Sequence, residues 1–413
     1  PGGDRDGNPF VTTEITRKTA QLLRSSLIRN YYRDVRKLRR RLTFAGVEEL
    51  VLEVERKLYN SIFKLDGAPE ISLVDLKEKL GEILEKVETE YHGLFDNELR
   101  DFIAKVNVFG YHFASLDIRQ DSRVHHDAFL TLLEHTNKEG ITDASFNYKN
   151  ATEEERIAFL TSLQGNVDPN TFEDETVRKA LGSIRAMKEI QQTNGEAGCN
   201  RYIISNNQTA QNIFEVFAMI RLSDWTTPTV DVVPLFETIP DLKIAVEVMD
   251  TVYSNPVYRE HLSRRGDKQT IMLGFSDGTK DGGYLMANWS IFKAKEELTA
   301  ISRKHGIKVA FFDGRGGPPA RGGGNTHQFY ASMGSSVEAD EIQLTVQGQT
   351  ISSNFGTLDT CRYNLEQLLS SGISNRLFTE KTTDLDDEDR ATMVHLAETS
   401  YQAYKDFKAH PKF

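Results

Sequence analysis

Residues 232–237 read Val-Val-Pro-Leu-Phe-Glu, a short apolar run that closes on a carboxylate. A helical pattern follows, so this stretch predicts a buried strand and the helix after it. Other runs share the arrangement: His112 to Ile118 closing on Arg119, Tyr202 to Ile204 closing on Ser205 and Asn206, Ile271 to Phe275 closing on Asp277, and Val309 to Phe312 closing on Asp313. Repeated units of this kind predict a parallel sheet, whose chemistry gathers at the carboxyl ends of its strands.

Helical patterns outnumber the strands, at about 13–42, 47–63, 73–103, 122–135, 152–163 and 172–192. No Gly-x-Gly-x-x-Gly follows the first strand, which disfavours a Rossmann-type sheet. We expect an α/β, predominantly α-helical protein, an incomplete TIM-like (β/α) barrel wrapped by many additional helices. The predicted division is a helical segment flanking the barrel at 1–110, barrel strands and active-site loops at 111–350, and a C-terminal helical segment at 351–413.

Composition narrows the class of protein. The 413 residues have a formal net charge of -11, which disfavours nucleic acid as a partner. No apolar run reaches the length of a membrane span, and no signal-peptide pattern is present. The two cysteines, Cys199 and Cys361, exclude a disulfide framework and suit a reducing compartment. We therefore expect a cytoplasmic protein without a membrane partner.

Glycines and arginines follow the apolar run that ends at Phe312. The stretch 314–324 reads Gly-Arg-Gly-Gly-Pro-Pro-Ala-Arg-Gly-Gly-Gly. Arg315 and Arg321 offer planar forks of donors, and glycines such as Gly316 and Gly317 let backbone N–H groups approach an anion closely. Arg-Gly-Gly repeats also occur in disordered RNA-binding segments, but this stretch is single and follows a strand. It predicts a site for a small anionic substrate.

Two carboxylates close neighbouring predicted strands. Glu237 and Asp277 would meet at one edge of the sheet, and paired carboxylates are a common way to hold Mg²⁺ or Mn²⁺. The alternative is that each caps a helix or pairs with an arginine. Lys280, in the glycine-containing segment after Asp277, adds a cation beside the same strand end. The histidines form no spaced metal motif.

In this order, several motifs closely resemble phosphoenolpyruvate carboxylase. The matching stretches are Gly2 to Pro9, Leu116 to Gln120, Val233 to Thr238, Gly274 to Asp277 with Lys280 and Asp281, and Gly314 to Gly324. The resemblance implies an allosteric, anaplerotic lyase that fixes carbon dioxide and feeds the tricarboxylic acid cycle: it carboxylates phosphoenolpyruvate with bicarbonate, giving oxaloacetate and phosphate. It also implies a homotetrameric parent protein and a divalent metal.

The resemblance assigns roles to the candidate residues. Glu237 and Asp277 would bind Mg²⁺ or Mn²⁺, and Arg119 would bind the phosphoryl group. The arginines of the glycine-rich stretch, with their flanking glycines, would bind bicarbonate and also meet aspartate or malate as feedback inhibitor. Lys280 is a secondary electrostatic candidate. The catalytic candidates are Arg119, Lys280, Asp313, Arg315 and Arg321.

The chain also departs from the family pattern. Asp313 stands where the commoner loop has the histidine of Phe-His-Gly-Arg-Gly-Gly, so the role of that histidine is altered or taken over. The Thr-Ala-His-Pro-Thr-Glu and Gly-Ser-Arg-Pro segments of the family do not occur in the sequence. We expect a piece of a longer protein without turnover by itself. Two alternatives are a non-catalytic anion-binding barrel domain and another metal-dependent enzyme that handles enolates.

Overall fold

The computed structural model describes residues 2–8, 10–63, 70–314, 325–346, 348–377 and 385–412, without the side chains of residues 275–278, 375 and 376. The chain forms two compact units. The first comprises Pro1–Ile118 and Pro169–Arg201, and the second comprises Arg119–Asp168 and Tyr202–Phe413. The predicted three-part division at residues 110 and 350 stays a prediction.

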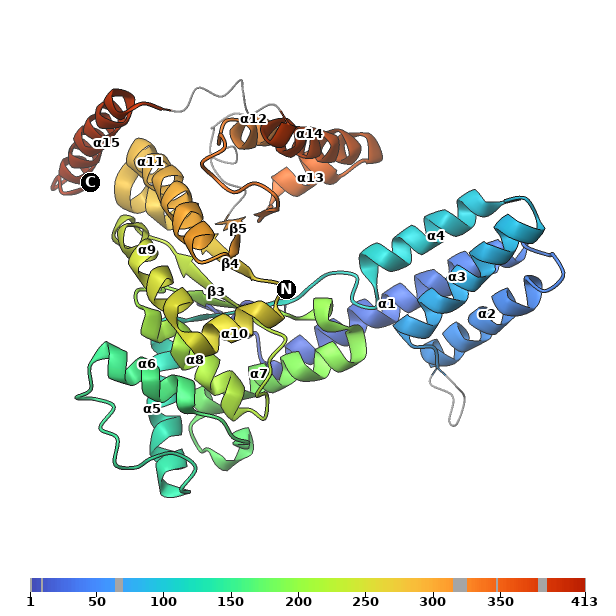
Figure 1. The fold of residues 1–413 in the computed structure, drawn as a ribbon, viewed down its shortest axis with the longest axis horizontal. Coiled ribbons are helices and arrows are strands. Elements are labelled where there is room, and N and C mark those ends of the chain that lie inside the picture. The colour runs from blue at the N-terminus through green and yellow to red at the C-terminus, as the bar shows by residue number, and fades with distance from the viewer. Residues whose placement is uncertain are drawn as a thin grey trace. The chain divides into compact units, whose positions relative to one another are not determined.

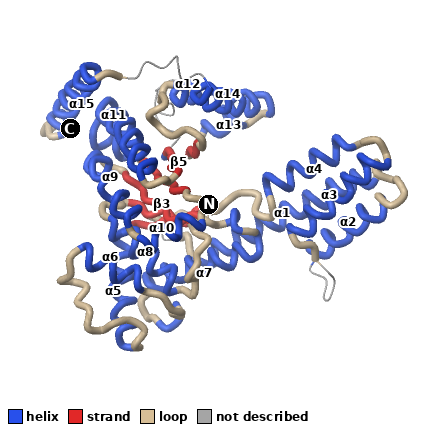
Figure 2. Tube along the Cα trace, in the orientation of Figure 1, coloured by secondary structure: helices blue, strands red, loops and turns tan. Residues whose placement is uncertain are grey.

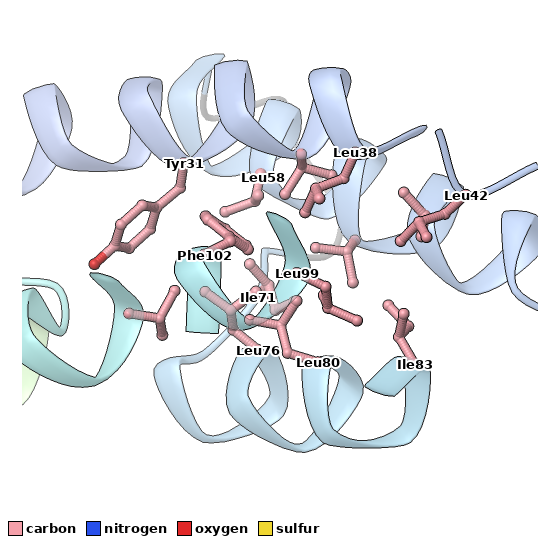
Figure 3. Close-up of a cluster of buried hydrophobic side chains, with 14 of the residues drawn as sticks. Tyr31, Leu38, Leu42, Leu58, Ile71, Leu76, Leu80, Ile83, Leu99 and Phe102 are labelled. Atoms are coloured by element: carbon pink, nitrogen blue, oxygen red, sulfur yellow. The ribbon is translucent and has the colours of Figure 1, made fainter. Parts of the chain in front are cut away.

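The first unit is helical (Figure 1). Its main helices are α1 (Thr13–Arg39), α2 (Glu48–Phe63), α3 (Leu73–Glu90), α4 (Asp96–Phe109) and α7 (Glu175–Asn194), with short 3₁₀ turns at Pro169–Thr171 and Glu196–Gly198. Apolar residues three and four positions apart on α1 to α4 point into a common core. Figure 3 shows side chains of this core, where Tyr31 packs edge-on against Phe102 at 5.5 Å between ring centroids.

One predicted helix of this unit was wrong. The pattern over 73–103 is split into α3 and α4, because His92, Gly93 and Phe95 all have positive φ angles. A right-handed helix cannot contain such residues. The apolar periodicity continues on both sides of the break, since both helices face the same core, and so it conceals the turn.

The second unit is built on the strands of the sheet, shown in red in Figure 2. They are β1 (Asp117–Asp121), β2 (Arg201–Ser205), β3 (Asp231–Phe236), β4 (Lys268–Leu273), β5 (Lys308–Asp313) and β6 (Ile342–Leu344), hydrogen-bonded in chain order. The sheet is parallel and curls into a half-barrel, and the protein is mostly helical, which confirms the predicted incomplete barrel wrapped by helices. The short strand β6 was not predicted.

Helices cover the sheet and extend beyond it. Helices α8 (Ala210–Leu222), α9 (Ile239–Ser254), α10 (Pro256–Arg264) and α11 (Phe275–Lys304) pack against its strands (Figure 2). The remaining helices of the second unit are α5 (Ser122–Lys138), α6 (Glu153–Ser162), α12 (Thr326–Ala331), α13 (Gln349–Phe355), α14 (Leu358–Leu377) and α15 (Asp387–Lys408). Parallel strands joined by helices are the arrangement that the repeated strand and helix patterns predicted.

The two faces of the sheet differ in what they carry. Alternate residues of neighbouring strands form a small apolar cluster on one face, here called the cluster face: Ile203, Val233, Leu235, Met272 and Phe312. Because successive side chains of a strand point to opposite sides, Tyr202, Phe311 and Asp313 lie on the other face, here called the helix face. Side chains of α5 and α11 contact these residues there.

Candidate active site

Glu237 directly follows β3, as the sequence predicted. Its Oε2 accepts a hydrogen bond from the backbone N–H of Asn206 at 2.9 Å. Its Oε1 lies 3.7 Å from Nη2 of Arg119. The two side chains keep 17% and 26% of their surface exposed, Glu237 the smaller fraction. The carboxylate is therefore oriented by the protein and still reached by solvent.

Arg119 contradicts one detail of the prediction. The expected strand ended before it, whereas β1 spans Asp117–Asp121 and places Arg119 at its centre. The residues just before β1 cannot extend the strand, because Phe113 has a φ of 62° and Ala114 donates its N–H to the carbonyl of His112 in a tight turn. Arg119 nevertheless comes within reach of Glu237, and its role at the phosphoryl group stays a prediction.

Asn206 links three consecutive strand ends. It follows β2 with a φ of 53°, a left-handed conformation that asparagine tolerates better than most residues. Its carbonyl accepts a hydrogen bond from Ser122 Oγ at 2.6 Å, at the start of α5, while its N–H holds Glu237. The sequence showed Asn206 only as the end of a strand. An asparagine directly after a buried strand was the available signal for such a turn.

Gly274 lies against Glu237 from the next strand. It follows β4, and its N–H donates to the carbonyl of Phe236 at 2.8 Å. A Cβ atom at this position would stand 3.0 Å from Cα and 3.2 Å from Cγ of Glu237. Such contacts are closer than a side chain normally makes, so the approach of the two backbones requires glycine. Gly274 thus shapes the space beside the carboxylate.

Asp277 and Lys280 both lie near the start of α11, which begins at Phe275. The side chain of Asp277 lies outside the described part of the structure, and its role as a metal ligand stays a prediction. Lys280 is exposed, and its carbonyl accepts hydrogen bonds from Tyr404 at 3.2 Å and Lys408 at 2.9 Å. Helix α15 therefore packs beside this segment.

The predicted anion-binding residues Arg315, Gly316, Gly317 and Arg321 lie outside the described residues, and their roles stay predictions. The described chain reaches Gly314 after β5 and resumes at Asn325, immediately before α12.

Asp313 is the last residue of β5 and lies on the helix face. Its Oδ1 is 2.8 Å from Nζ of Lys295 in α11, and its Oδ2 accepts a hydrogen bond from Tyr330 Oη at 2.5 Å. The side chains of Lys295 and Asp313 are 2% and 1% exposed. Burial, together with the Asp313 carboxylate, raises the pKa of Tyr330. Lys295 and Tyr330 were not singled out from the sequence, although a lysine within the apolar pattern of a long helix was a signal.

A divalent metal fits the chemistry of Glu237. Carboxylate oxygen is the donor that Mg²⁺ and Mn²⁺ prefer, and Gly274 places no side chain beside this group. Among residues with described side chains, no cluster of three or more His, Cys, Asp and Glu is arranged to hold a metal. A metal at Glu237 would therefore draw its other ligands from Asp277, water and substrate.

Comparison with protein families matches residues 1–70 and 70–413 to the family described as phosphoenolpyruvate carboxylase. The chain belongs to the phosphoenolpyruvate carboxylase family. This confirms the predicted resemblance, and the family carboxylates phosphoenolpyruvate. Within the described ranges, no helix combines the length and the apolar composition that crossing a bilayer requires.

Proposed function

We propose that this chain carries the metal-binding and phosphate-binding residues of a phosphoenolpyruvate carboxylase, which converts phosphoenolpyruvate and bicarbonate to oxaloacetate and phosphate. The observation that carries the proposal is the approach of Glu237, directly after β3, to Arg119 of β1, within 3.7 Å, in a chain of this family. An anchored carboxylate beside a guanidinium is suited to a metal and a phosphoryl group bound side by side.

Glu237 and Asp277 are the proposed ligands of Mg²⁺ or Mn²⁺. The Asn206 N–H holds one oxygen of Glu237, and Gly274 leaves space along its side chain. A bound metal of this kind acts as a Lewis acid that stabilises the negative charge of an enolate. The protein keeps the carboxylate in a single orientation, so that little reorganisation accompanies the reaction.

Arg119 is the proposed partner of the phosphoryl group. A guanidinium presents paired donors to phosphate oxygens, and its charge does not depend on pH in the physiological range. Its distance from Glu237 is longer than a hydrogen bond, so the carboxylate attracts the guanidinium electrostatically without a direct hydrogen bond. Phosphoenolpyruvate would therefore meet a cation already in place.

The remaining roles rest on the sequence and the family. Arg315 and Arg321, with Gly316 and Gly317, would bind bicarbonate, and Lys280 would add positive charge. A bicarbonate oxygen attacks phosphorus, the bond from phosphorus to the enol oxygen breaks, and carboxyphosphate and the enolate of pyruvate form. Carboxyphosphate then releases phosphate and carbon dioxide, and the enolate carbon bonds to carbon dioxide to give oxaloacetate. Because these reactants are anions, positioning and charge stabilisation should dominate the rate.

We further propose the regulation and setting that the family suggests. Aspartate or malate would bind at the arginines of residues 314–324 as feedback inhibitor, and the parent protein would be a cytoplasmic homotetramer. The two cysteines and the net charge of -11 agree with a reducing compartment and with no nucleic-acid partner.

Metal binding tests the proposal directly. We expect Glu237→Gln and Asp277→Asn each to weaken Mn²⁺ binding, measured by calorimetry, by at least about tenfold, since each removes a charged oxygen donor. Asp281→Asn is the matched control, because Asp281 lies in the same helix but accepts a hydrogen bond from the Ile239 N–H at the start of α9. Unchanged Mn²⁺ affinity in Glu237→Gln would exclude this site.

Turnover is measured with the full-length gene product. We expect bicarbonate-dependent formation of oxaloacetate, and a fall of about 100-fold or more in kcat for Glu237→Gln, the size of effect seen when charge stabilisation in a transition state is lost. Absence of bicarbonate dependence in the unchanged protein would contradict the proposed reaction.

A further inference from the structure

The carboxylate of Asp313 lies on the helix face of the sheet, away from the cluster face. Phe312, one residue earlier, belongs to the cluster face together with Leu235 of β3. Alternation along β5 directs Asp313 to the helix face, where its carboxylate contacts Lys295 of α11. Asp313, at the end of β5, therefore points toward the helices and away from the cluster face.

Asp313 is enclosed by its partners. Lys295 approaches both carboxylate oxygens, at 2.8 Å and 2.9 Å, and Tyr330 donates to one of them. The ammonium of Lys295 also lies between 5.4 Å and 5.7 Å from the ring centroids of Phe311, Phe329 and Tyr330. Such ring faces attract a cation. Asp313 is 0% exposed, so a substrate in solution does not reach its carboxylate.

This group of side chains joins three elements of the fold. Asp313 ends β5, Lys295 belongs to the middle of α11, and Tyr330 belongs to α12. In sequence, Asp313 precedes residues 315–324 and Tyr330 follows them. The hydrogen bond between Asp313 and Tyr330 therefore connects the described chain on the two sides of the glycine-rich stretch.

From this geometry we propose that Asp313 is a positioning residue rather than a catalytic residue. Through Lys295 and Tyr330, its carboxylate holds together the elements from which the glycine-rich stretch begins and ends. The proposal refines the proposed function, on which its effect on bicarbonate binding rests. It assigns the proton transfers of the reaction to groups other than Asp313.

The energetics make the proposal testable by paired substitution. A buried charge left without its partner is strongly destabilising, whereas replacing both members of a buried pair together is often tolerated. Asp313→Asn leaves Lys295 as an unbalanced buried cation, and Lys295→Gln leaves Asp313 as an unbalanced anion. The double variant Asp313→Asn, Lys295→Gln keeps a hydrogen-bonding pair of similar size without either charge.

The experiment uses the full-length gene product with both single variants, the double variant and Tyr330→Phe. We expect each single variant at the charged pair to lower Tm by about 5 °C or more. We also expect each to raise the KM for bicarbonate several-fold. The double variant should recover most of both losses, and Tyr330→Phe, which removes one hydrogen bond, should show a smaller change of the same kind. The pH profile of kcat should keep its shape throughout.

Two results would overturn the proposal. One is a double variant that regains Tm but keeps the low kcat of Asp313→Asn, with one limb of the pH profile lost, since that behaviour belongs to a group that transfers a proton. The other is a double variant whose Tm is as low as the sum of the two single losses. If the unchanged protein forms no oxaloacetate, the proposed function fails, while the recovery of Tm still decides whether Asp313 and Lys295 act as a pair.

Discussion

Two pairs of an acid and a base at the sheet, Glu237 with Arg119 and Asp313 with Lys295, differ in separation and burial. At the proposed metal site, Glu237 and Arg119 stand 3.7 Å apart and are 17% and 26% exposed. On the helix face, Asp313 and Lys295 stand 2.8 Å apart and are almost fully buried. The charges of the first pair stay accessible to a ligand. The charges of the second pair are buried and interact only with neighbouring protein groups. Burial thus separates the acid that is proposed to bind a ligand from the acid that holds elements of the fold together.

Removing the cation from each pair should give the largest difference in the free energy of unfolding. Lys295→Met leaves a buried carboxylate unpaired, and we expect a loss of about 3–5 kcal/mol in the free energy of unfolding. Arg119→Met removes a partly exposed and longer pairing, and we expect a loss below about 1 kcal/mol. Urea unfolding of the two variants measures both values. Equal losses would show that the two pairs do not differ in this way.

The next largest effect should come from acid, which lowers the stability of the packing on the helix face. His125 of α5 is buried, its Nε2 lies 3.0 Å from Tyr202 Oη of β2, and burial lowers its pKa from 6.5 to about 4. Because the folded-state pKa lies below the unfolded value, the unfolded chain binds the proton more readily between these two pH values. Stability is therefore full above about pH 6.5 and falls by up to about 3 kcal/mol as the pH drops toward 4.

The matched variant for this measurement is His125→Gln, which stays neutral at every pH and can still bond to Tyr202 Oη. Burial lowers the pKa of His261 to about 4 as well, so both histidines contribute to the acid sensitivity of the unchanged protein. The difference between the two Tm curves from pH 7 to pH 4 isolates His125. Parallel curves would show that His125 does not titrate as its burial requires.

A methyl group beside Glu237 should lower stability less than the changes above, but it should clearly weaken Mn²⁺ binding. Gly274→Ala would place Cβ 3.0 Å from Cα of Glu237, so the turn after β3 must move. We expect about 1–3 kcal/mol of destabilisation, as for other overpacked sites, and weaker Mn²⁺ binding. Gly266→Ala gives a comparison, since its positive φ adds backbone strain while nothing lies within 4 Å of the added atom. Full Mn²⁺ affinity in Gly274→Ala would argue against a role for Gly274 in shaping the site.

Much of the fold could be predicted because local patterns control it. The strand ending before Glu237 and the helix from Thr13 follow directly from runs of apolar residues and from 3.6-residue periodicity. The break between α3 and α4 was missed, because periodicity records which face is buried and not the left-handed residues that reverse the chain. The centre of β1 at Arg119 was missed for a similar reason, since the turn at Phe113 lies inside an apolar run.

The sequence by itself determined the family, the half-barrel of parallel strands and the placing of Glu237 at a strand end, because these depend on residue order and short-range periodicity. Only the tertiary structure decided which acid is buried against a partner and which stays accessible to solvent. Two sets of contacts join residues distant in sequence. Asp313 pairs with Lys295 and Tyr330. Asn206 and Gly274 contact Glu237. Such contacts depend on how helices pack onto strands, and no local pattern records that packing.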